Sequence, residues 1–426
     1  MRLNRKDSKF EAIRLGQLQN GLSYALWPDS RDAVATLQIW VSVGSRDEAN
    51  GKTGLAHMLE HLMFRGSATV PDGEFDRRME SLGAQVNAAT WLDYTYYTTT
   101  VHAAALPEVL ELEADRFAHL LITQEVFRAE REVVANERRQ VVESDPESMM
   151  MERFYREIYG ESCYGWPTIG WSDDIAGYRA EDAQAFHQEA YAPSRLFISI
   201  AGAVDPSQTL ALLERTLGSL APRQSVRPQR EVALSESFCR TMTLPVAAPR
   251  VNLAWPTEGR RAPSFAVWCL LHDLLSGGDS ALLPAALEVN EKLVLDVNAS
   301  QYDHALPSLF EISATLRQGV GPERIRQAVD AVLMKLAESG PTEDDMVVAK
   351  TRLRAQDALS LAGTYARAED LGESWIAFGD PLAGLRLRDE IVAVTAAEIR
   401  RLAHRMLHEL PRYELVVLPT GSDEEA

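Results

Sequence analysis

The same order of strand-like and helix-like segments occurs twice in this chain of 426 residues. The two copies are separated by residues 220–231, which contain two prolines, four charged residues and no sustained apolar periodicity, as expected of a linker. A chain of this length exceeds what one hydrophobic core usually organises. The sequence therefore predicts two domains of mixed α/β structure, over residues 1–222 and 233–426, related by internal duplication.

Hydrophobic periodicity locates the elements within each half. Residues 34–43 alternate apolar and polar side chains and are rich in β-branched types, which predicts a strand. Residues 53–65 have helical spacing, with Thr53 as the expected N-cap and Gly66 as the expected end. Further helices are expected at 71–82, 106–121, 124–144, 263–275, 322–338, 343–362 and 396–407, and a helix is expected to open at 205–207. Further strands are expected at 85–101 (one or two), 195–202, 239–244, 251–255, 294–302, 310–316 and 413–418.

Charge and composition exclude several classes of protein. A net charge of −19 argues against nucleic acid as a ligand, because phosphates would be repelled. Three cysteines do not form a disulfide framework. The basic residues at 1–10 are not followed by an apolar stretch, so no secretory signal is expected, and no apolar stretch is long enough to span a bilayer. We expect a cytoplasmic protein, or a periplasmic one if a signal peptide has been removed.

The segment 54–64 contains the pattern of chemical interest, H-x-x-E-H. His57 and His61 are four residues apart, so on a helix their imidazoles project from one face and can share a metal ion. Glu60 lies on the same side of the helix. A catalytic zinc ion needs three protein ligands and one free position for water, and a nearby carboxylate must accept the proton of that water. The pattern therefore predicts two zinc ligands and a general base, Glu60.

The third ligand is expected from the charged segment 127–139. Glu130 and Glu137 are seven residues apart and share one helical face, whereas Glu132 points elsewhere. One of the two carboxylates could bind the metal while the other orients a ligand or the water. By spacing alone, an ordinary charged helix surface remains the alternative, because four arginines occur in the same stretch.

The chain resembles the pitrilysin-type (M16) zinc metallopeptidases, most closely the short two-domain branch that includes the mitochondrial processing peptidase. The matching segments are 18–22, 43–48, 53–66, 87–90, 93–97, 113–116, 130–137, 164–165, 169–170 and 191–193. The resemblance implies an α+β fold of two homologous domains, each a mixed, largely antiparallel sheet flanked by helices, which together form half of a clam-like chamber.

The resemblance also implies a role for each matching residue. His57, His61 and Glu137 would bind one Zn²⁺ per chain, Glu60 would be the catalytic base, and Glu130 would be an acid that supports the ligands. The strand around Asn87 and Ala88 would offer its edge to an extended peptide, which is how a sheet edge recognises varied sequences. The alternative for Asn87 is a turn or strand-end residue.

The second half departs from the family pattern. Self-sufficient members carry an arginine after the glycine-rich turn and a tyrosine about a dozen residues later. Here the turn at 276–280 is followed by Ala281, Leu282 and Leu283, and the tyrosine position falls near Leu295 and Asp296. We therefore expect a heterodimer with a homologous chain that lacks H-x-x-E-H but keeps the Arg/Tyr pair, or alternatively a homodimer.

The predicted function is that of a zinc endopeptidase subunit acting on peptides or unfolded polypeptides. Two other functions stay open at this point: a structural subunit of the same fold, and a zinc-dependent module that captures peptides without cutting them.

Overall fold

The computed structural model describes residues 12–420, so the basic N-terminal stretch 1–10 lies outside the described residues. The chain forms two compact units. The first unit takes the chain up to Val142 together with Glu161–Glu231 and Ser360–Gly384, and the second takes Glu143–Gly160, Val232–Leu359 and the chain from Leu385 onward. The predicted domains, 1–222 and 233–426, are each one continuous stretch of the sequence. The two units are not continuous, because each unit includes a helix from the opposite half of the sequence.

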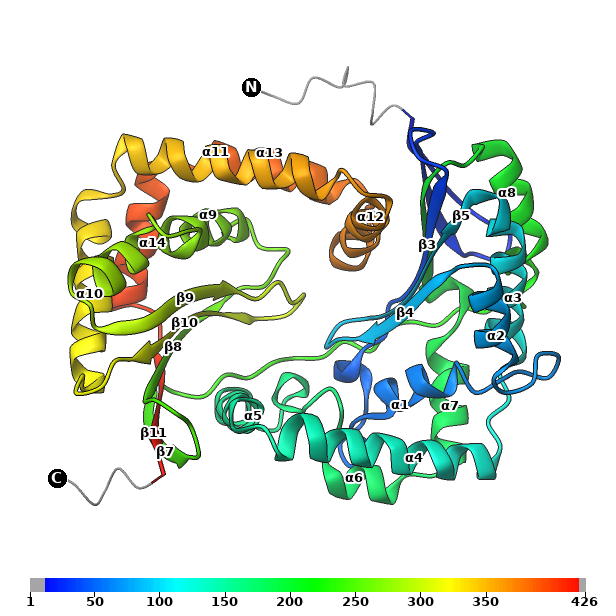
Figure 1. The fold of residues 1–426 in the computed structure, drawn as a ribbon, viewed down its shortest axis with the longest axis horizontal. Helices are drawn as coiled ribbons and strands as arrows, with labels where there is room; N and C mark the ends of the chain where they lie inside the picture. The colour runs from blue at the N-terminus through cyan, green and yellow to red at the C-terminus, as the bar shows by residue number, and fades with distance from the viewer. Residues whose placement is uncertain (1–11, 421–426) are drawn as a thin grey trace. The chain divides into compact units, whose positions relative to one another are not determined.

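The first unit is built on a six-stranded sheet in the order β1-β2-β6-β3-β5-β4 (Figure 1). Its strands are β1 (Arg14–Gln17), β2 (Ser23–Pro28), β3 (Val34–Val41), β4 (Gln85–Thr90), β5 (Thr95–His102) and β6 (Leu196–Gly202). Only the β2–β6 pair is parallel. The strand β4 pairs with β5 alone, so it is an edge of the sheet.

The second unit contains a five-stranded sheet in the order β7-β11-β8-β10-β9. Its strands are β7 (Phe238–Leu244), β8 (Arg250–Thr257), β9 (Val294–Gln301), β10 (Ser308–Leu316) and β11 (Tyr413–Pro419). The pair β7–β11 is parallel and the other pairs are antiparallel. This order is that of β2-β6-β3-β5-β4 in the first unit, which confirms the duplication read from the sequence.

Helices flank both sheets. The first unit has α1 (Leu55–Leu62), α2 (Glu74–Ser81), α3 (Leu106–His119), α4 (Gln124–Arg138), α6 (Ser172–Gly177), α7 (Ala180–Ala190), α8 (Pro206–Arg215) and α12 (Thr364–Phe378). The second unit has α5 (Pro146–Tyr159), α9 (Phe265–Ser276), α10 (Pro322–Ser339), α11 (Glu343–Ser360), α13 (Ala383–Ala393) and α14 (Ala396–His408). From residue 12 to residue 420, no helix combines the length and apolarity needed to cross a bilayer.

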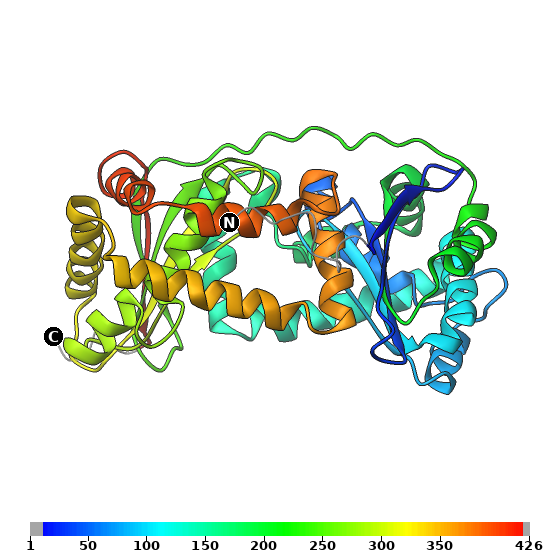
Figure 2. The same cartoon turned by 90° about the horizontal axis from the view of Figure 1, so that it is seen from above.

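Residues 221–237 form no helix or strand, as expected of a linker (Figure 2). Part of this stretch is nevertheless fixed to the first unit by arginine side chains. The Arg227 guanidinium donates to both carboxylate oxygens of Asp47, at 2.9 and 2.6 Å. Arg230 Nη2 donates to the carbonyl oxygen of Glu48 at 2.7 Å. Both acceptors lie in the segment that precedes α1, where Asp47 ends a 3-10 helix and Glu48 follows it.

The polar face of β3 is buried, although its alternating pattern predicts exposure to water. Thr36 and Gln38 are fully buried because α12, from the far end of the sequence, lies on β3 and β6 (Figure 1). The hydroxyls of Thr36 and Thr364 are 2.9 Å apart, and the ring of Trp375 stacks on that of Phe197. No helix was expected at 364–378, and local periodicity alone cannot show which distant segment covers a sheet.

Gly372 sets how closely α12 approaches this sheet. A Cβ atom at Gly372 would lie 2.0 Å from the indole ring of Trp40, which is itself fully buried. The helix can pack here only because residue 372 has no side chain.

We predict that Gly372→Ala destabilises the protein, even though alanine favours helix over glycine by about 1 kcal/mol. Overpacking against Trp40 should lower the free energy of unfolding by about 1–3 kcal/mol, measured by thermal or urea denaturation. Gly177→Ala, at an exposed position within α6, has open space around the new Cβ and is the matched control. A Gly372→Ala protein as stable as the wild type would contradict this packing.

Candidate metal centre and active site

The helix α1 presents an apolar face to the core and a polar face to the site. Leu55, Met58, Leu59 and Leu62 are buried, whereas His57, Glu60 and His61 are only partly buried. This amphipathic division holds the two histidines on one side of a helix whose other side is fixed by packing.

The start of α1 differs from the prediction. The prediction that Thr53 is the N-cap is wrong. The N-cap is Gly54, which has a φ of 90°. A Cβ at Gly54 would lie 2.4 Å from the carbonyl oxygen of Ile169, so both the conformation and the space require glycine. The Thr53 hydroxyl instead donates to the Asp174 carboxylate at 2.6 Å and accepts from the Trp171 amide.

A buried carboxylate satisfies the first amides of α1. Glu48 is 1% exposed, and its two oxygens accept from the backbone N–H groups of Gly54 and Ala56 at 2.8 and 2.7 Å. A negative charge at this end also interacts favourably with the helix dipole. Burial raises the pKa of Glu48 well above its usual value, and these two hydrogen bonds oppose the rise.

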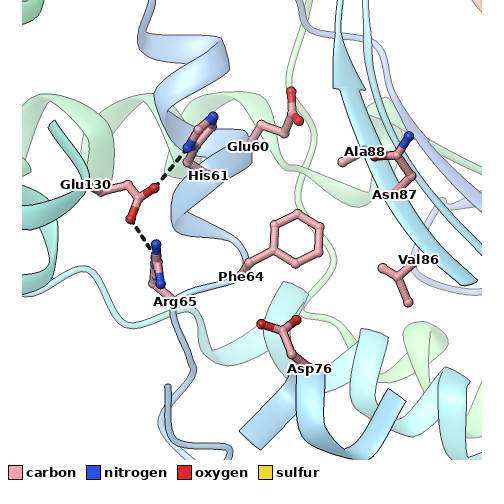
Figure 3. A pocket seen from close by; sticks show the side chains of 9 residues that line it. All are labelled: Glu60, His61, Phe64, Arg65, Asp76, Val86, Asn87, Ala88 and Glu130. Carbon is pink, nitrogen blue, oxygen red and sulfur yellow. Dashed lines mark hydrogen bonds and ion pairs between the residues drawn. The ribbon is translucent and has the colours of Figure 1, made fainter. Parts of the chain in front are cut away.

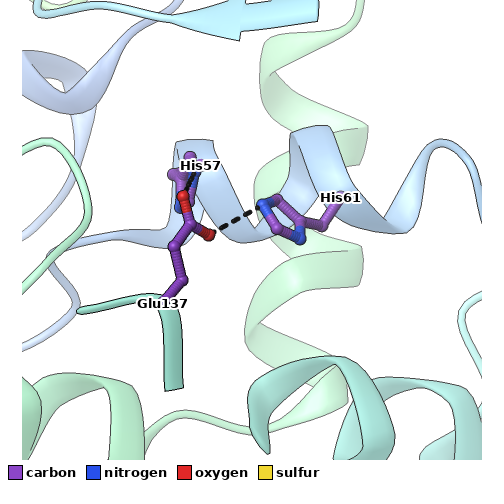
Figure 4. A group of neighbouring side chains, drawn as sticks. All are labelled: His57, His61 and Glu137. Atoms are coloured by element: carbon purple, nitrogen blue, oxygen red, sulfur yellow. Dashed lines mark ion pairs between the residues drawn. The ribbon is translucent and has the colours of Figure 1, made fainter. Parts of the chain in front are cut away.

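Three side chains converge where the sequence predicted a metal (Figure 4). Glu137 Oε1 lies 3.8 Å from His57 Nε2, and Glu137 Oε2 lies 3.4 Å from His61 Nε2. One ligand atom from each of the three residues lies within 4.8 Å of the others. Ligands about 2.0–2.2 Å from a tetrahedral zinc ion are separated by roughly 3.3–3.6 Å, so the residues fit zinc with little movement.

Glu130 supports this group without joining it. Its carboxylate pairs with His61 Nδ1 at 2.9 Å and with Arg65 Nε at 2.5 Å (Figure 3). Because Nδ1 faces a carboxylate, the other ring nitrogen, Nε2, is directed toward Glu137. A carboxylate on the far side of a ligating imidazole fixes the ring and increases its basicity. Glu137 thus faces both histidines, whereas Glu130 lies on the outer side of His61.

The two imidazoles differ in their affinity for protons. Burial, aided by the neighbouring His61, lowers the pKa of His57 to about 4. Burial also opposes protonation of His61, but hydrogen bonds to Glu130 and Glu137 outweigh it and raise the pKa to about 9. His57 is therefore neutral and ready to ligate, while His61 must give up a proton before it can bind a cation.

Glu60 is held beside the metal ligands but does not join them. Its Oε2 accepts a hydrogen bond from the hydroxyl of Thr90 on β4 at 2.5 Å. Burial raises the pKa of Glu60, and the bond from Thr90 opposes this effect. A carboxylate with a raised pKa, tied to the edge strand by one bond, is suited to take up and release a proton.

A cavity of about 310 Å³ adjoins these residues (Figure 3). It is lined by Glu60, His61, Phe64, Arg65, Asp76, Val86, Asn87, Ala88 and Glu130. Asn87 and Ala88 lie within the edge strand β4, so Asn87 is in mid-strand and not at a turn. The structure thus brings the proposed substrate strand and the proposed base to one cavity.

Sequence reasoning did not identify three residues of this site. Glu48, Arg65 and Thr90 belonged only to segments that matched the family, with no role of their own. Glu48 precedes the helix that it caps by six to eight residues, so no capping pattern could have revealed it.

In the second unit, other residues stand where the family pattern has the Arg/Tyr pair, as the sequence already indicates. After the glycine-rich turn, Ala281 and Leu283 are buried in the core. Leu295, near the expected tyrosine position, is an exposed apolar residue on β9.

Two family models match the chain. Residues 24–170 match the insulinase model of peptidase family M16, and residues 178–353 match the model described as the peptidase M16 inactive domain. Together they span most of both units. The chain is a member of peptidase family M16.

Similar M16 proteins are named as zinc proteases. Zinc protease PqqE of Helicobacter pylori is 28% identical over 82% of this chain and 81% of its own. An uncharacterized zinc protease of Mycobacterium tuberculosis is 29% identical over 91% of this chain and 89% of its own. Subunit beta of the mitochondrial-processing peptidase of Lentinula edodes is 24% identical, covering 92% and 87%.

Solved structures agree with this family. A protease from Helicobacter pylori superposes with a TM-score of 0.89 at 25% identity, covering 96% of this chain and 99% of that one. An M16 inactive domain from Pseudomonas fluorescens, 16% identical, has a TM-score of 0.86 over 96% and 98% and shows the fold alone. The expectation of two homologous domains, each with a flanked, largely antiparallel sheet, is confirmed.

We predict that His57→Ala and Glu137→Gln each lower zinc affinity by at least tenfold, because each removes one of three ligands. Metal content after dialysis, measured by elemental analysis, provides the test. Glu132→Gln removes a carboxylate from the exposed side of the same helix as Glu137 and should leave zinc content unchanged. Equal zinc in all four proteins would contradict the site.

Proposed function

We propose that this chain is the metal-bearing subunit of an M16 zinc endopeptidase that hydrolyses peptides or unfolded polypeptides. The observation that carries the proposal is the convergence of His57, His61 and Glu137, with Glu60 beside them and a cavity in front. Relatives named as zinc proteases support the same chemistry.

One zinc ion per chain, held by these three residues, would supply the Lewis acidity that polarises a carbonyl group and lowers the pKa of water. Glu60 would accept the proton of the attacking water and pass it to the leaving amine. Thr90 keeps the Glu60 carboxylate in place, and Glu130 keeps Nε2 of His61 turned toward the ligand group.

The substrate would bind as an added strand along β4. This edge strand has no second strand partner among the described residues, so its outer backbone groups are available for pairing with an extended chain. Asn87 and Ala88 lie at the cavity that also contains Glu60, so a peptide bond held there would be near the proposed base.

Because the Arg/Tyr pair is missing, we infer that the activity of this chain depends on a partner chain. Without these residues, the second unit offers buried alanine and leucine where donors to the substrate are expected. We propose a heterodimer with a homologous chain that carries the pair; a homodimer is the alternative. The relative named as subunit beta of the mitochondrial-processing peptidase belongs to a multi-subunit enzyme.

We predict that Glu60→Gln retains zinc but loses at least 10²-fold in peptide cleavage, since an amide cannot accept the proton. Zinc analysis and cleavage of a fluorogenic peptide, each in the presence of the partner, measure the two effects. Glu132→Gln is again the control. Undiminished cleavage by Glu60→Gln would remove Glu60 from the mechanism. If the zinc-loaded wild type binds peptides but never cuts them, the chain is a binding or structural subunit.

We also predict that the purified chain alone cleaves peptides weakly and that a homologous chain with the Arg/Tyr pair raises kcat/KM by at least tenfold. The reason is that donors to the substrate would come from the partner. Kinetics at increasing partner concentration, with complex formation followed by light scattering, provide the measurement. Full activity of the isolated chain would exclude the dependence.

A further inference from the structure

The helix α14, in the second unit, carries another pair of histidines four residues apart. His404 and His408 lie in the C-terminal half of this helix, so their imidazoles project from one side of it. Their ring centroids are 4.6 Å apart, which is also the separation of His57 and His61 on α1. A spacing that holds two metal ligands in the first unit thus occurs again in the second, where the sequence analysis assigned it no role.

Both histidines of α14 are outside the core. The side chain of His404 is 56% exposed, and His408 is exposed as well. The buried side of the helix consists of apolar residues: Ile399, Leu402, Ala403 and Met406. Among the described residues, Glu409 is the charged partner of His404, and no hydrogen bond joins either imidazole to another group. Packing therefore does not explain the pair, and its ring nitrogens remain available to a ligand.

Glu409 lies beside His404 much as Glu130 lies beside His61. Oε1 of Glu409 is 3.5 Å from Nδ1 of His404, and Oε1 of Glu130 is 2.9 Å from Nδ1 of His61. A carboxylate at one ring nitrogen fixes the orientation of the imidazole and makes the other nitrogen a better metal ligand. In His404 that other nitrogen is Nε2.

The positive charge next to the pair is largely compensated. Nη2 of Arg405 lies 3.2 Å from Oε1 of Glu258, and its Nε lies 4.0 Å from Oε2 of Glu409. Arg401, one turn earlier on α14, is exposed, so water and salt screen its charge. These arginines weaken the attraction of the histidines for a cation without abolishing it.

A simpler explanation for a histidine near the end of a helix is electrostatic. A protonated imidazole in the last turn interacts favourably with the negative end of the helix dipole, and the effect falls off beyond that turn. His408 lies in the last turn of α14, but His404 does not. The helix dipole therefore accounts for one histidine and not for the pair.

The donor atoms decide which kind of ion fits. Imidazole nitrogens suit divalent first-row transition ions, whereas Mg²⁺ and Ca²⁺ prefer oxygen ligands. Within residues 12–420, only His57, His61 and Glu137 form a cluster of three potential ligands. An ion on α14 would therefore have two protein ligands and would complete its coordination with water, so it would bind less tightly than an ion at the metal centre.

We propose that His404 and His408 form a second site for a divalent transition-metal ion, with Glu409 orienting His404. The site is formed entirely by α14 and the residue that follows it, whereas the metal centre belongs to the first unit. It therefore does not depend on peptide cleavage. Cu²⁺ should bind there more tightly than Zn²⁺, in keeping with the general order of affinities for nitrogen ligands.

Metal titration of the full-length chain tests this site. Calorimetry of the metal-free protein with Zn²⁺ should resolve a tight site and a weaker one. His404→Asn and His408→Asn should each lower the affinity of the weaker site at least tenfold and leave the tight site and peptide cleavage unchanged. His57→Ala should weaken the tight site alone, so a failure of this proposal is distinguishable from a failure of the metal centre.

A control variant and a second measurement complete the test. His102→Asn removes a lone exposed histidine and should leave both sites unchanged. An ion that bridges both histidines binds the folded helix and not the unfolded chain. Excess Zn²⁺ should therefore raise the Tm of the His57→Ala protein more than that of the same protein with His408→Asn added. A single site in the wild-type titration, or a weaker site that keeps its affinity in the His404→Asn/His408→Asn double variant, would overturn the proposal.

Discussion

The geometry of the site depends on how the first turn of α1 is held. This helix carries both histidines and the proposed base, and its leading amides donate to the buried carboxylate of Glu48. The loop that contains Glu48 is in turn bound by Arg230, and the preceding residue, Asp47, is bound by Arg227. A rotation of α1 about its axis that separated His57 and His61 from Glu137 would also have to break these bonds. The ligands are therefore positioned by these bonds at the start of their helix together with the packing of its apolar face into the core.

The sequence predicted which side chains share one helical face, but not the long-range contacts that support them. The spacing of His57, Glu60 and His61 determines which face they share, whatever surrounds the helix. The spacing of Glu130 and Glu137 could not decide which binds metal, because the answer depends on how α4 lies against α1. Thr53 was a misleading capping signal, since its hydroxyl bonds to Asp174 from another part of the chain. Asp145-Pro146 is an N-cap followed by a proline, a pattern that would have predicted the start of α5, just as Asp205-Pro206 predicted the start of α8.

The two homologous sheets are covered by helices in different ways. In each unit, a helix from the other half of the sequence lies over the polar face of the sheet. In the first unit, α12 covers this face closely, and Thr36 and Gln38 are buried under it. In the second unit, α5 leaves a cavity above β8, β9 and β10. The difference follows from side chains: Gly372 allows close approach in one unit, whereas Glu147, Met150 and Met151 border open space in the other.

The origin of α12 also bears on how the protein can be synthesised. A ribosome completes the first sheet when β6 emerges, but the helix that covers it is translated much later, after most of the second unit. During that interval the uncovered face of β3 meets water. This face also carries Trp40 and Phe197, but its threonine and glutamine side chains remain hydrated until α12 arrives and so limit the apolar patch that could aggregate. The polar side chains of a surface that is fully buried in the native protein thus reduce aggregation of the nascent chain before α12 has been synthesised.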